Sequence, residues 1–213
     1  MAAQAKTRRH LGARANVFID GKYSFALDIR LAEKHDLRRG VVVDEKFLAQ
    51  LLEEDGDAKA YARALFFLSY RPRSIAEVRT KLKRDEWPDE VIARVLARLQ
   101  DEKLLGDENF STVWVEHRTL SRKPRGAGVL RAELRHKGVD KETIDEALPD
   151  SDEELENAIV AMRQILSSKE RAWSTLEARE KQNKLFATMQ RRGFNYGVAK
   201  TAWNHLQEEA EAE

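Results

Sequence analysis

Lysine and arginine side chains concentrate between residues 118 and 138, and the chemistry they offer is anion binding. The stretch reads R-T-L-S-R-K-P-R-G-A-G-V-L-R-A-E-L-R-H-K-G, with Glu133 as its one acid, whereas the whole chain has a formal net charge of only +1. Such a local excess is typical of a surface that meets a polyanion or an acidic protein groove. A solvated face of a charged helical protein explains the same residues, and composition alone does not separate the two. The cations are Arg118, Arg122, Lys123, Arg125, Arg131, Arg135 and Lys137.

A similar basic segment precedes it, because Arg71-Pro72-Arg73-Ser74 corresponds to Arg122-Lys123-Pro124-Arg125-Gly126. In both, a proline stands just before a predicted helix, and the first N–H groups of a helix have no partner inside it. Free N–H groups beside basic side chains suit phosphate or carboxylate. The remaining candidate contacts are Arg79, Lys81 and Lys83 on the helix after the first segment, and Arg191 and Arg192 near the C-terminus.

No combination of residues predicts catalysis, a cofactor or a metal site. The five histidines are scattered, and the absence of cysteine excludes thiolate nucleophiles and zinc–thiolate sites. The acidic runs lack the alternating oxygen ligands and central glycine of a calcium loop. Gly126-Ala127-Gly128 lacks the Lys-Ser/Thr of a phosphate-binding loop, so we read it as the tight start of a helix. We therefore expect a binding protein, not an enzyme.

The composition is that of a soluble helical protein, with 35% charged and 42% apolar residues among 213. No apolar run approaches the ~18 residues of a membrane span, and no signal-peptide pattern is present. We expect a cytoplasmic location and no membrane contact.

The elements that position the basic residues repeat along the chain. Starting from Leu82, Leu134 or Met189, an apolar residue stands four positions before and five after, and further ones follow in the next predicted helix. These anchors are 52 and 55 residues apart, which is the period of a three-helix unit. Each unit is too small to bury its own apolar face, so we expect the units to stack into an elongated, curved array.

A small α+β module precedes the repeats. Asp20-Gly21 between two β-branched and aromatic runs predicts a hairpin, followed by a helix at 28–37, a short strand at 41–43 and a helix at 45–54. The fold class is therefore mainly α, with tandem three-helix repeats after the module. The predicted boundaries are a disordered basic arm at 1–15, the module at 16–56, repeats at 57–105, 106–149 and 150–208, and an acidic tail at 209–213.

Several segments resemble the RecX family, the bacterial regulators of the RecA recombinase. They are S-Y-R-P-R-S-I-A-E-V-R-T-K-L-K-R, W-P-D-E-V-I-A-R-V-L-A-R-L, L-G-D-E-N-F-S, R-K-P-R-G, L-R-A-E-L-R-H-K-G-V-D and R-R-G-F-N. The resemblance covers about residues 58–206, and the segment at 16–54 is similar to an N-terminal part of some members. It implies tandem three-helix repeats that lie in the groove of the RecA filament on DNA and limit its growth and strand exchange. It thereby implies roles in DNA recombination, DNA repair and the SOS response, and weaker binding to single-stranded and double-stranded DNA.

Two departures from the family pattern concern the third repeat: its acidic C-terminus and its long connection between the first and second helices. They leave open whether this member inhibits filaments or stabilises them in some contexts. We expect a monomer without cofactors that acts by occupancy. The alternative is an independent helical protein that reads duplex DNA, against which stand the lack of an Asn/Gln/Arg-rich recognition face and of a dimer seam.

Overall fold

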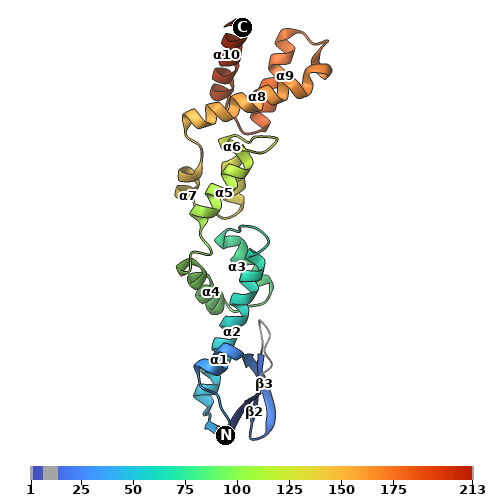
Figure 1. Cartoon of the computed structure of the whole chain (residues 1–213). Coiled ribbons are helices and arrows are strands. Elements are labelled where there is room, and N and C mark those ends of the chain that lie inside the picture. Colours follow the sequence, from blue (N-terminus) through green and yellow to red (C-terminus); the bar gives the residue numbers. More distant parts are fainter. Residues whose placement is uncertain (1, 7–13, 213) are drawn as a thin grey trace. The chain divides into compact units, whose positions relative to one another are not determined.

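The computed structural model describes residues 2–6 and 14–212, the side chains from 14 to 211, and ten helices and four strands in this part of the chain. These residues form two compact units (Figure 1). The first comprises residues 1–71 and 78–104, and the second comprises residues 72–77 and 105–213. None of the helices in the described part has the length and apolar character needed to cross a membrane.

The first unit begins with a four-stranded antiparallel sheet in the order β3-β2-β1-β4. The strands are β1 (Ala2–Lys6), β2 (Arg14–Ile19), β3 (Lys22–Asp28) and β4 (Val41–Val42). The hairpin at Asp20-Gly21 is confirmed, and both residues have the positive φ that such a turn requires (49° and 77°). A fully disordered arm at 1–15 was wrong, because residues 2–6 pair with β2 and β4; residues 7–13 lie outside the described residues.

Two helices cover this sheet, α1 (Ile29–Lys34) and α2 (Glu45–Leu68), around a core that includes Leu27 and Leu51. The predicted break between 54 and 58 was wrong, because α2 runs through Asp55-Gly56-Asp57. The carboxylate of Asp55 is 2% exposed, accepts hydrogen bonds from Arg14 (2.8 Å) and the Asp28 N–H (2.9 Å), and pairs with Lys59. Because its hydrogen bonds are satisfied, the buried Asp55 carboxylate holds α2 against the sheet. This contact helps to offset the destabilisation of about 1 kcal/mol that Gly56 causes inside the helix.

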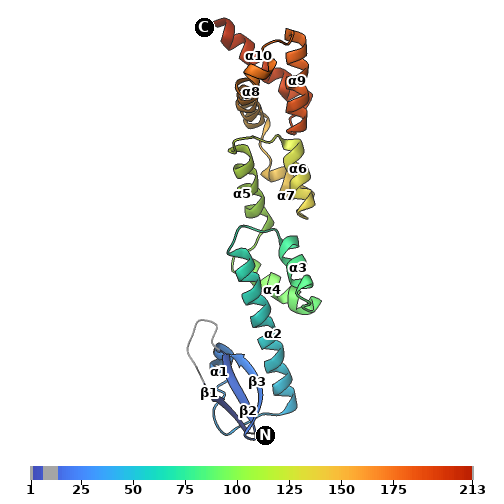
Figure 2. The same ribbon diagram turned by 90° about the vertical axis from the view of Figure 1, so that its right-hand side faces the viewer.

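Three consecutive sets of three helices follow the α+β module, which confirms the predicted fold class. Repeat 1 consists of α2, α3 (Ile75–Arg84) and α4 (Asp89–Asp101). Repeat 2 consists of α5 (Asp107–Thr119), α6 (Ala127–His136) and α7 (Lys141–Ala147), and repeat 3 of α8 (Ser151–Trp173), α9 (Ala178–Arg191) and α10 (Tyr196–Ala212). Within each repeat the first helix packs against the third, as both ribbon views show for α8 and α10 (Figure 2).

The repeat register derived from the spacing is confirmed by burial and by backbone geometry. The anchors Leu82, Leu134 and Met189 are all fully buried. Four positions after each anchor the backbone is left-handed, at Glu86 (φ 64°), Gly138 (φ 78°) and Gly193 (φ 96°). The turn between the second and third helices therefore has the same form in every repeat.

The first helices of repeats 1 and 3 bury alanines as well as larger apolar residues. Ala60 and Ala64 are buried in α2, and Ala158 and Ala161 are buried in α8 beside Met162 and Ile165. Leu120, which follows α5, is 86% exposed. Small side chains let two helices approach closely. The spacing of large apolar residues in the sequence does not identify the alanines that make such contacts.

The first helix of repeat 3 begins with a capping box. Asp150 accepts from the N–H of Asp152 and Glu153, while the carboxylate of Glu153 accepts from the N–H of Asp150. The acidic tail predicted from residue 209 is helical through 212, and Glu209 on α10 forms ion pairs with Arg163 of α8 and His205.

Candidate partner-binding surface

The two basic segments lead into the second helices of repeats 1 and 2, as predicted, but the starts of both helices are packed. The N–H of Gly126 donates to the carbonyl of Arg192 (2.9 Å), and that of Gly128 donates to the carbonyl of Gly193 (3.0 Å). Between them the N–H of Ala127 donates to the Glu154 carboxylate at 3.2 Å. The α6 start is therefore bound to the α9–α10 turn.

The start of α3 makes the equivalent contact with the turn between α6 and α7. The hydroxyl of Ser74 is fully buried and donates to the carbonyl of Lys137 at 2.6 Å, while the N–H of Ile75 donates to the Asp107 carboxylate at 2.9 Å. Burial of Asp107 raises the pKa of its carboxyl, an effect that the hydrogen bond from Ile75 opposes. The prediction that the N–H groups of these two helix starts are free for phosphate was wrong, since protein oxygens already accept from them.

Glycine is required at these junctions because the backbones approach closely. A Cβ atom on Gly126 would lie 2.6 Å from the backbone carbon of Gly193, and one on Gly138 would lie 2.5 Å from the Cβ of Ala76. On Gly193 a Cβ would lie 2.4 Å from the backbone nitrogen of Val129. The glycines of the R-K-P-R-G, K-G-V-D and R-R-G-F-N segments therefore serve packing between helices.

Three of the predicted contact residues are held inside the fold around Trp114 and in α3. The guanidinium of Arg118 and the ammonium of Lys137 lie 4.6 and 4.7 Å from the centre of the Trp114 ring, and Lys137 also pairs with Glu77 at 2.8 Å. Lys81 is mostly buried and pairs with Asp85. Cations held by a ring and a partly buried carboxylate stabilise the protein and are poorly placed to bind a partner.

The carboxylate of Glu133 fixes the positions of Trp114 and Arg118. It accepts a hydrogen bond from the indole N–H of Trp114 at 2.9 Å, and the Nε atom of Arg118 lies 2.9 Å from it. Glu133 was the single acid in the basic stretch, and it neutralises one of the seven cations locally. The charge of Arg118 is therefore compensated within the stretch itself.

The other predicted residues lie at or near the surface. Lys83 pairs with Asp89 (3.0 Å) and Arg131 with Asp145 (3.1 Å), in exposed contacts that contribute little to stability and compete weakly with a partner. Arg71 and Arg73 are half-buried. The side chains of Arg79, Arg122, Lys123, Arg135 and Arg191 are exposed, and none of the five forms an ion pair with another described residue.

Arg125 and Arg192 form a half-buried pair of like charges beside the α6 start. Burial, and secondarily the positive charge of Arg125, lower the pKa of the Arg192 guanidinium. One terminal nitrogen of Arg192, Nη1, is buried without a hydrogen-bond partner among the described residues. Two positively charged guanidiniums that lie close together favour binding of an anion beside them, because it offsets their repulsion.

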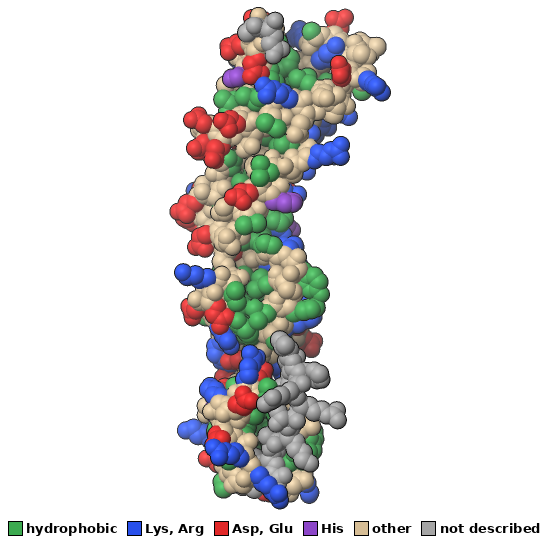
Figure 3. Space-filling model, viewed as in Figure 1, with side chains coloured by type: hydrophobic (Ala, Val, Ile, Leu, Met, Phe, Trp, Pro, Cys, Tyr) green, Lys and Arg blue, Asp and Glu red, His purple; other side chains and the backbone are tan. Residues whose placement is uncertain are grey.

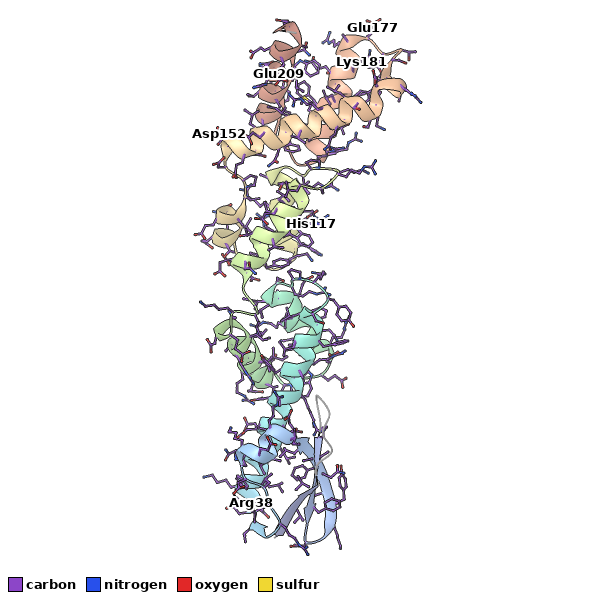
Figure 4. The ribbon with its side chains drawn as sticks, viewed as in Figure 1. Arg38, His117, Asp152, Glu177, Lys181 and Glu209 are labelled. Carbon is purple, nitrogen blue, oxygen red and sulfur yellow. The ribbon has the colours of Figure 1, made fainter. Side chains whose placement is uncertain are left out.

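Charge is unevenly distributed over the second unit. Figure 3 shows acidic side chains gathered over α7 and the start of α8, and cationic side chains projecting on the other side, at the loop between α5 and α6. His117, labelled on α5 in Figure 4, is exposed. No group of three or more His, Cys, Asp or Glu in the described part of the chain is placed to hold a metal ion.

Three family descriptions match the sequence in the order of the structural segments. "Regulatory protein RecX N-terminal domain" matches residues 10–44, "RecX, first three-helix domain" matches residues 60–99, and "RecX, second three-helix domain" matches residues 107–148. The first range contains β2, β3, α1 and β4, and the other two correspond to repeats 1 and 2.

Known proteins agree with these matches over nearly the whole chain. "Regulatory protein RecX" of Bacillus velezensis is 35% identical over 210 residues, which cover 97% of this chain and 78% of that protein. The protein of the same name from Bacillus subtilis is 36% identical over 205 residues, covering 95% and 76%.

Two solved structures have the same fold. A crystal structure of regulatory protein RecX superimposes with a TM-score of 0.76 at 27% identity and covers 96% of this chain and 100% of that one. The RecX structure from Lactobacillus salivarius gives a TM-score of 0.64 at 26% identity, covering 72% and 98%. The chain belongs to the RecX family of regulatory proteins.

Proposed function

We propose that this protein is a non-enzymatic modulator of the RecA recombinase that binds in the groove of the RecA–DNA filament. Occupancy of the groove limits filament extension, ATP turnover and strand exchange, and the protein binds DNA alone more weakly. It acts in the cytoplasm as a monomer, in recombination, repair and the SOS response. The function rests on family membership, and the contact surface rests on the loop between α5 and α6.

The loop formed by residues 120–126 carries the observation that supports this surface best. Arg122 and Lys123 are exposed and have no ion pair among the described residues, whereas Arg118 and Lys137 of the same basic stretch are held by the fold. Pro124 is buried and anchors the end of the loop, so the two cations project from a fixed base. Cations without internal partners lose least when they bind a phosphate or an acidic side chain.

The pair of Arg125 and Arg192 extends this surface to the neighbouring repeat. Arg125 precedes α6 and Arg192 lies in the α9–α10 turn, and backbone hydrogen bonds hold this turn against the start of α6. An anion of the filament bound beside the two guanidiniums would offset the repulsion between their positive charges. The proposed contact surface therefore consists of Arg122, Lys123, Arg125 and Arg192, and Arg71, Arg73, Arg79, Arg131, Arg135 and Arg191 are its secondary candidates.

The alternative function, a stand-alone reader of duplex DNA, has less support. A helix–turn–helix protein reads bases with the first residues of its second helix, which must be free to enter the major groove. Here the first residues of α3 and α6 are bonded to the turns after α6 and α9. Two of the three second helices could enter a groove only after these contacts opened.

The decisive experiment compares binding to naked DNA, free RecA and assembled filament at one salt concentration, using wild type and R122A/K123A. We expect wild type to prefer filament and the variant to bind it more weakly, with less inhibition of ATP turnover and strand exchange. If about 4 phosphates are contacted on a single strand, the log–log salt slope of wild type is about −3, and removing two contacts brings it to about −1.5.

A matched control removes two exposed cations elsewhere. Arg39 and Lys46 lie in the α+β module, and R39A/K46A changes the net charge by the same amount. Both variants should keep the unfolding free energy of wild type within about 0.5 kcal/mol, because the substituted side chains are exposed. Equal inhibition by R122A/K123A and wild type would refute the surface. Equal binding to filament and naked duplex would support the alternative.

A further inference from the structure

Repeat 3 has a groove between α9 and α10 that combines aromatic rings, side-chain amides and a lysine. Figure 4 labels Lys181 near the start of α9 and Glu209 near the end of α10, and the groove is formed by residues after the first and before the second. Its volume is about 350 Å³. The residues on which the argument depends are Asn183, Phe186, Gln190, Tyr196, Lys200 and Trp203.

Helical spacing brings these side chains to the two walls of the groove. On α9, Asn183, Phe186 and Gln190 follow one another at intervals of three and four, so they share one face. On α10, Tyr196 and Lys200 are one turn apart and likewise share a face. The arrangement is thus fixed by two well-packed helices, not by a loop.

The aromatic rings form a continuous cluster with one accessible end. The ring centre of Phe186 lies 5.6 Å from that of Tyr196 and 6.5 Å from that of Trp203. Phe186 and Trp203 also pack against the core of repeat 3, whereas Tyr196 is 57% exposed. A single exposed tyrosine is ordinary on a protein surface. The ring of Tyr196, however, packs against Phe186 on one side and is exposed to solvent on the other, so it offers a surface on which a base can stack.

The polar residues of the groove select the kind of ligand. Neither this groove nor its neighbour, of about 750 Å³, is lined by any Asp or Glu among the described residues, although acids are as frequent as bases in the chain. The neighbouring groove shares Ala187 and Gln190 with the first and adds Lys169 and Arg191. Lys200 and Lys169 form no ion pair with another described residue.

We propose that the α9–α10 groove binds the bases of single-stranded nucleic acid. One base stacks on Tyr196, the amides of Asn183 and Gln190 hydrogen-bond base edges, and Lys200, Lys169 and Arg191 accompany the phosphates along both grooves. This inference deepens the direct DNA binding of the proposed function and assigns it to repeat 3. The filament contact through Arg122 and Lys123 stays separate, on the loop of repeat 2.

The test titrates the full-length protein with a fluorescein-labelled 20-mer of thymidylate, dT20, and follows anisotropy together with intrinsic tryptophan fluorescence. The variants are Y196A, which removes the ring, and Y196F, which keeps it. Y23A is the matched control, because Tyr23 on β3 is about as exposed as Tyr196. We expect Y196A to weaken dT20 binding about five- to tenfold, with Y196F and Y23A within about twofold of wild type.

A 20-mer of abasic deoxyribose phosphate separates base stacking from charge. It should bind wild type and Y196A equally and more weakly than wild type binds dT20, and only dT20 should quench tryptophan fluorescence. A parallel titration with rU20 shows whether DNA or RNA is preferred, and a loss with Y196A on either strand supports the groove. Equal binding of Y196A and wild type to both dT20 and rU20, or equal affinity of wild type for dT20 and the abasic strand, would overturn the inference.

Failure of this inference is distinguishable from failure of the proposed function. If wild type bound assembled filament but not dT20, the groove and the direct DNA binding would both be wrong while the filament contact stood. If Y196A lost dT20 binding and R122A/K123A inhibited the filament as well as wild type, the groove would stand and the loop surface would fall.

Discussion

Replacing Gly193 by alanine should open the junction between α6 and the α9–α10 turn. Gly193 has φ +96° and its carbonyl accepts from the N–H of Gly128 at 3.0 Å. An added Cβ would lie 2.4 Å from the backbone nitrogen of Val129 and 2.8 Å from two of its side-chain carbons. Backbone atoms of a helix cannot rotate out of the way as the end of a flexible side chain can, so the turn itself must move.

The expected loss of unfolding free energy has two parts. Placing a side chain at a left-handed position costs about 1–2 kcal/mol. Overpacking against a close-packed backbone costs about 1–3 kcal/mol more. We therefore expect G193A to lower the unfolding free energy by about 2–5 kcal/mol. G193N separates the parts, since asparagine tolerates positive φ but retains the clashing Cβ, and it should keep most of the loss.

Urea unfolding followed by circular dichroism measures the loss, and hydrogen exchange of residues 120–135 locates it. Exchange of the Gly126 and Gly128 amides should accelerate in G193A, because these N–H groups donate to the turn. Gly197, four residues after Gly193 and inside α10, provides the control for a glycine-to-alanine change. Its φ is not in the left-handed region, and an added Cβ would meet only the Asn195 side chain, at 3.2 Å. We expect G197A to be neutral or to gain up to about 1 kcal/mol.

A loss below about 1 kcal/mol in G193A, with unchanged exchange at residues 120–135, would refute this reasoning. It would mean that the turn and α6 are not held together as the hydrogen bonds indicate. The same variant also bears on function, because Arg192 precedes the substituted glycine. Opening the junction should separate Arg125 from Arg192 and weaken filament binding without removing a charge.

Two further predictions concern the first unit. G56A should raise the unfolding free energy by about 0.5–1 kcal/mol in urea unfolding, because Gly56 is helical and a Cβ there meets nothing within 4 Å, so a destabilised variant would show that the α2 backbone is strained at this point. Hydrogen bonds from His35 and then Lys34 lower the pKa of Glu54 from 4.5 to about 2. The stability from this lowered pKa is present above pH 4.5 and is lost as pH falls towards 2. Between pH 5 and 2.5 the unfolding free energy of wild type should therefore fall by about 1 kcal/mol relative to that of E54Q. If the unfolding free energies of the two proteins changed in parallel with pH, this carboxylate would make no contribution.

The repeat could be predicted from the sequence because its signal is carried by large buried side chains. Leu82, Leu134 and Met189 are fully buried and followed by the same turn in each repeat. The roles of small residues and of residues paired across the fold could not be predicted in this way. Ala60 is buried, but alanine is too small to mark a helix contact in a hydrophobic pattern. Asp55 in an Asp-Gly-Asp sequence is typical of a linker, and its burial depends on Arg14 and Asp28, which only the fold places beside it.

For the candidate surface, the positions of the cations could be predicted from the sequence, but their ion-pair partners could not. Sequence spacing places cations on a helix but does not tell which of them meet a carboxylate from elsewhere in the fold. Lys137 pairs with Glu77 across 60 residues of chain, and no local pattern links the two. The groove of repeat 3 escaped notice because it needs Asn183 and Tyr196 from different helices, and neither carries a charge that stands out in composition.

The junctions explain why the basic proline–glycine segments suggest phosphate binding in the sequence. A helix start with small residues and unpaired N–H groups fits any oxygen that accepts hydrogen bonds, and a peptide carbonyl meets this requirement as well as a phosphate does. In this protein the carbonyls of Arg192 and Gly193 occupy the position at the start of α6. These carbonyls are neutral, and the Glu154 carboxylate accepts from the N–H of Ala127. Arg122, Lys123 and Arg125 form no ion pair with another described residue at the edge of the junction. The packing that removes the helix start as an anion site thus leaves these cations beside a fixed turn, where an acidic partner can reach them.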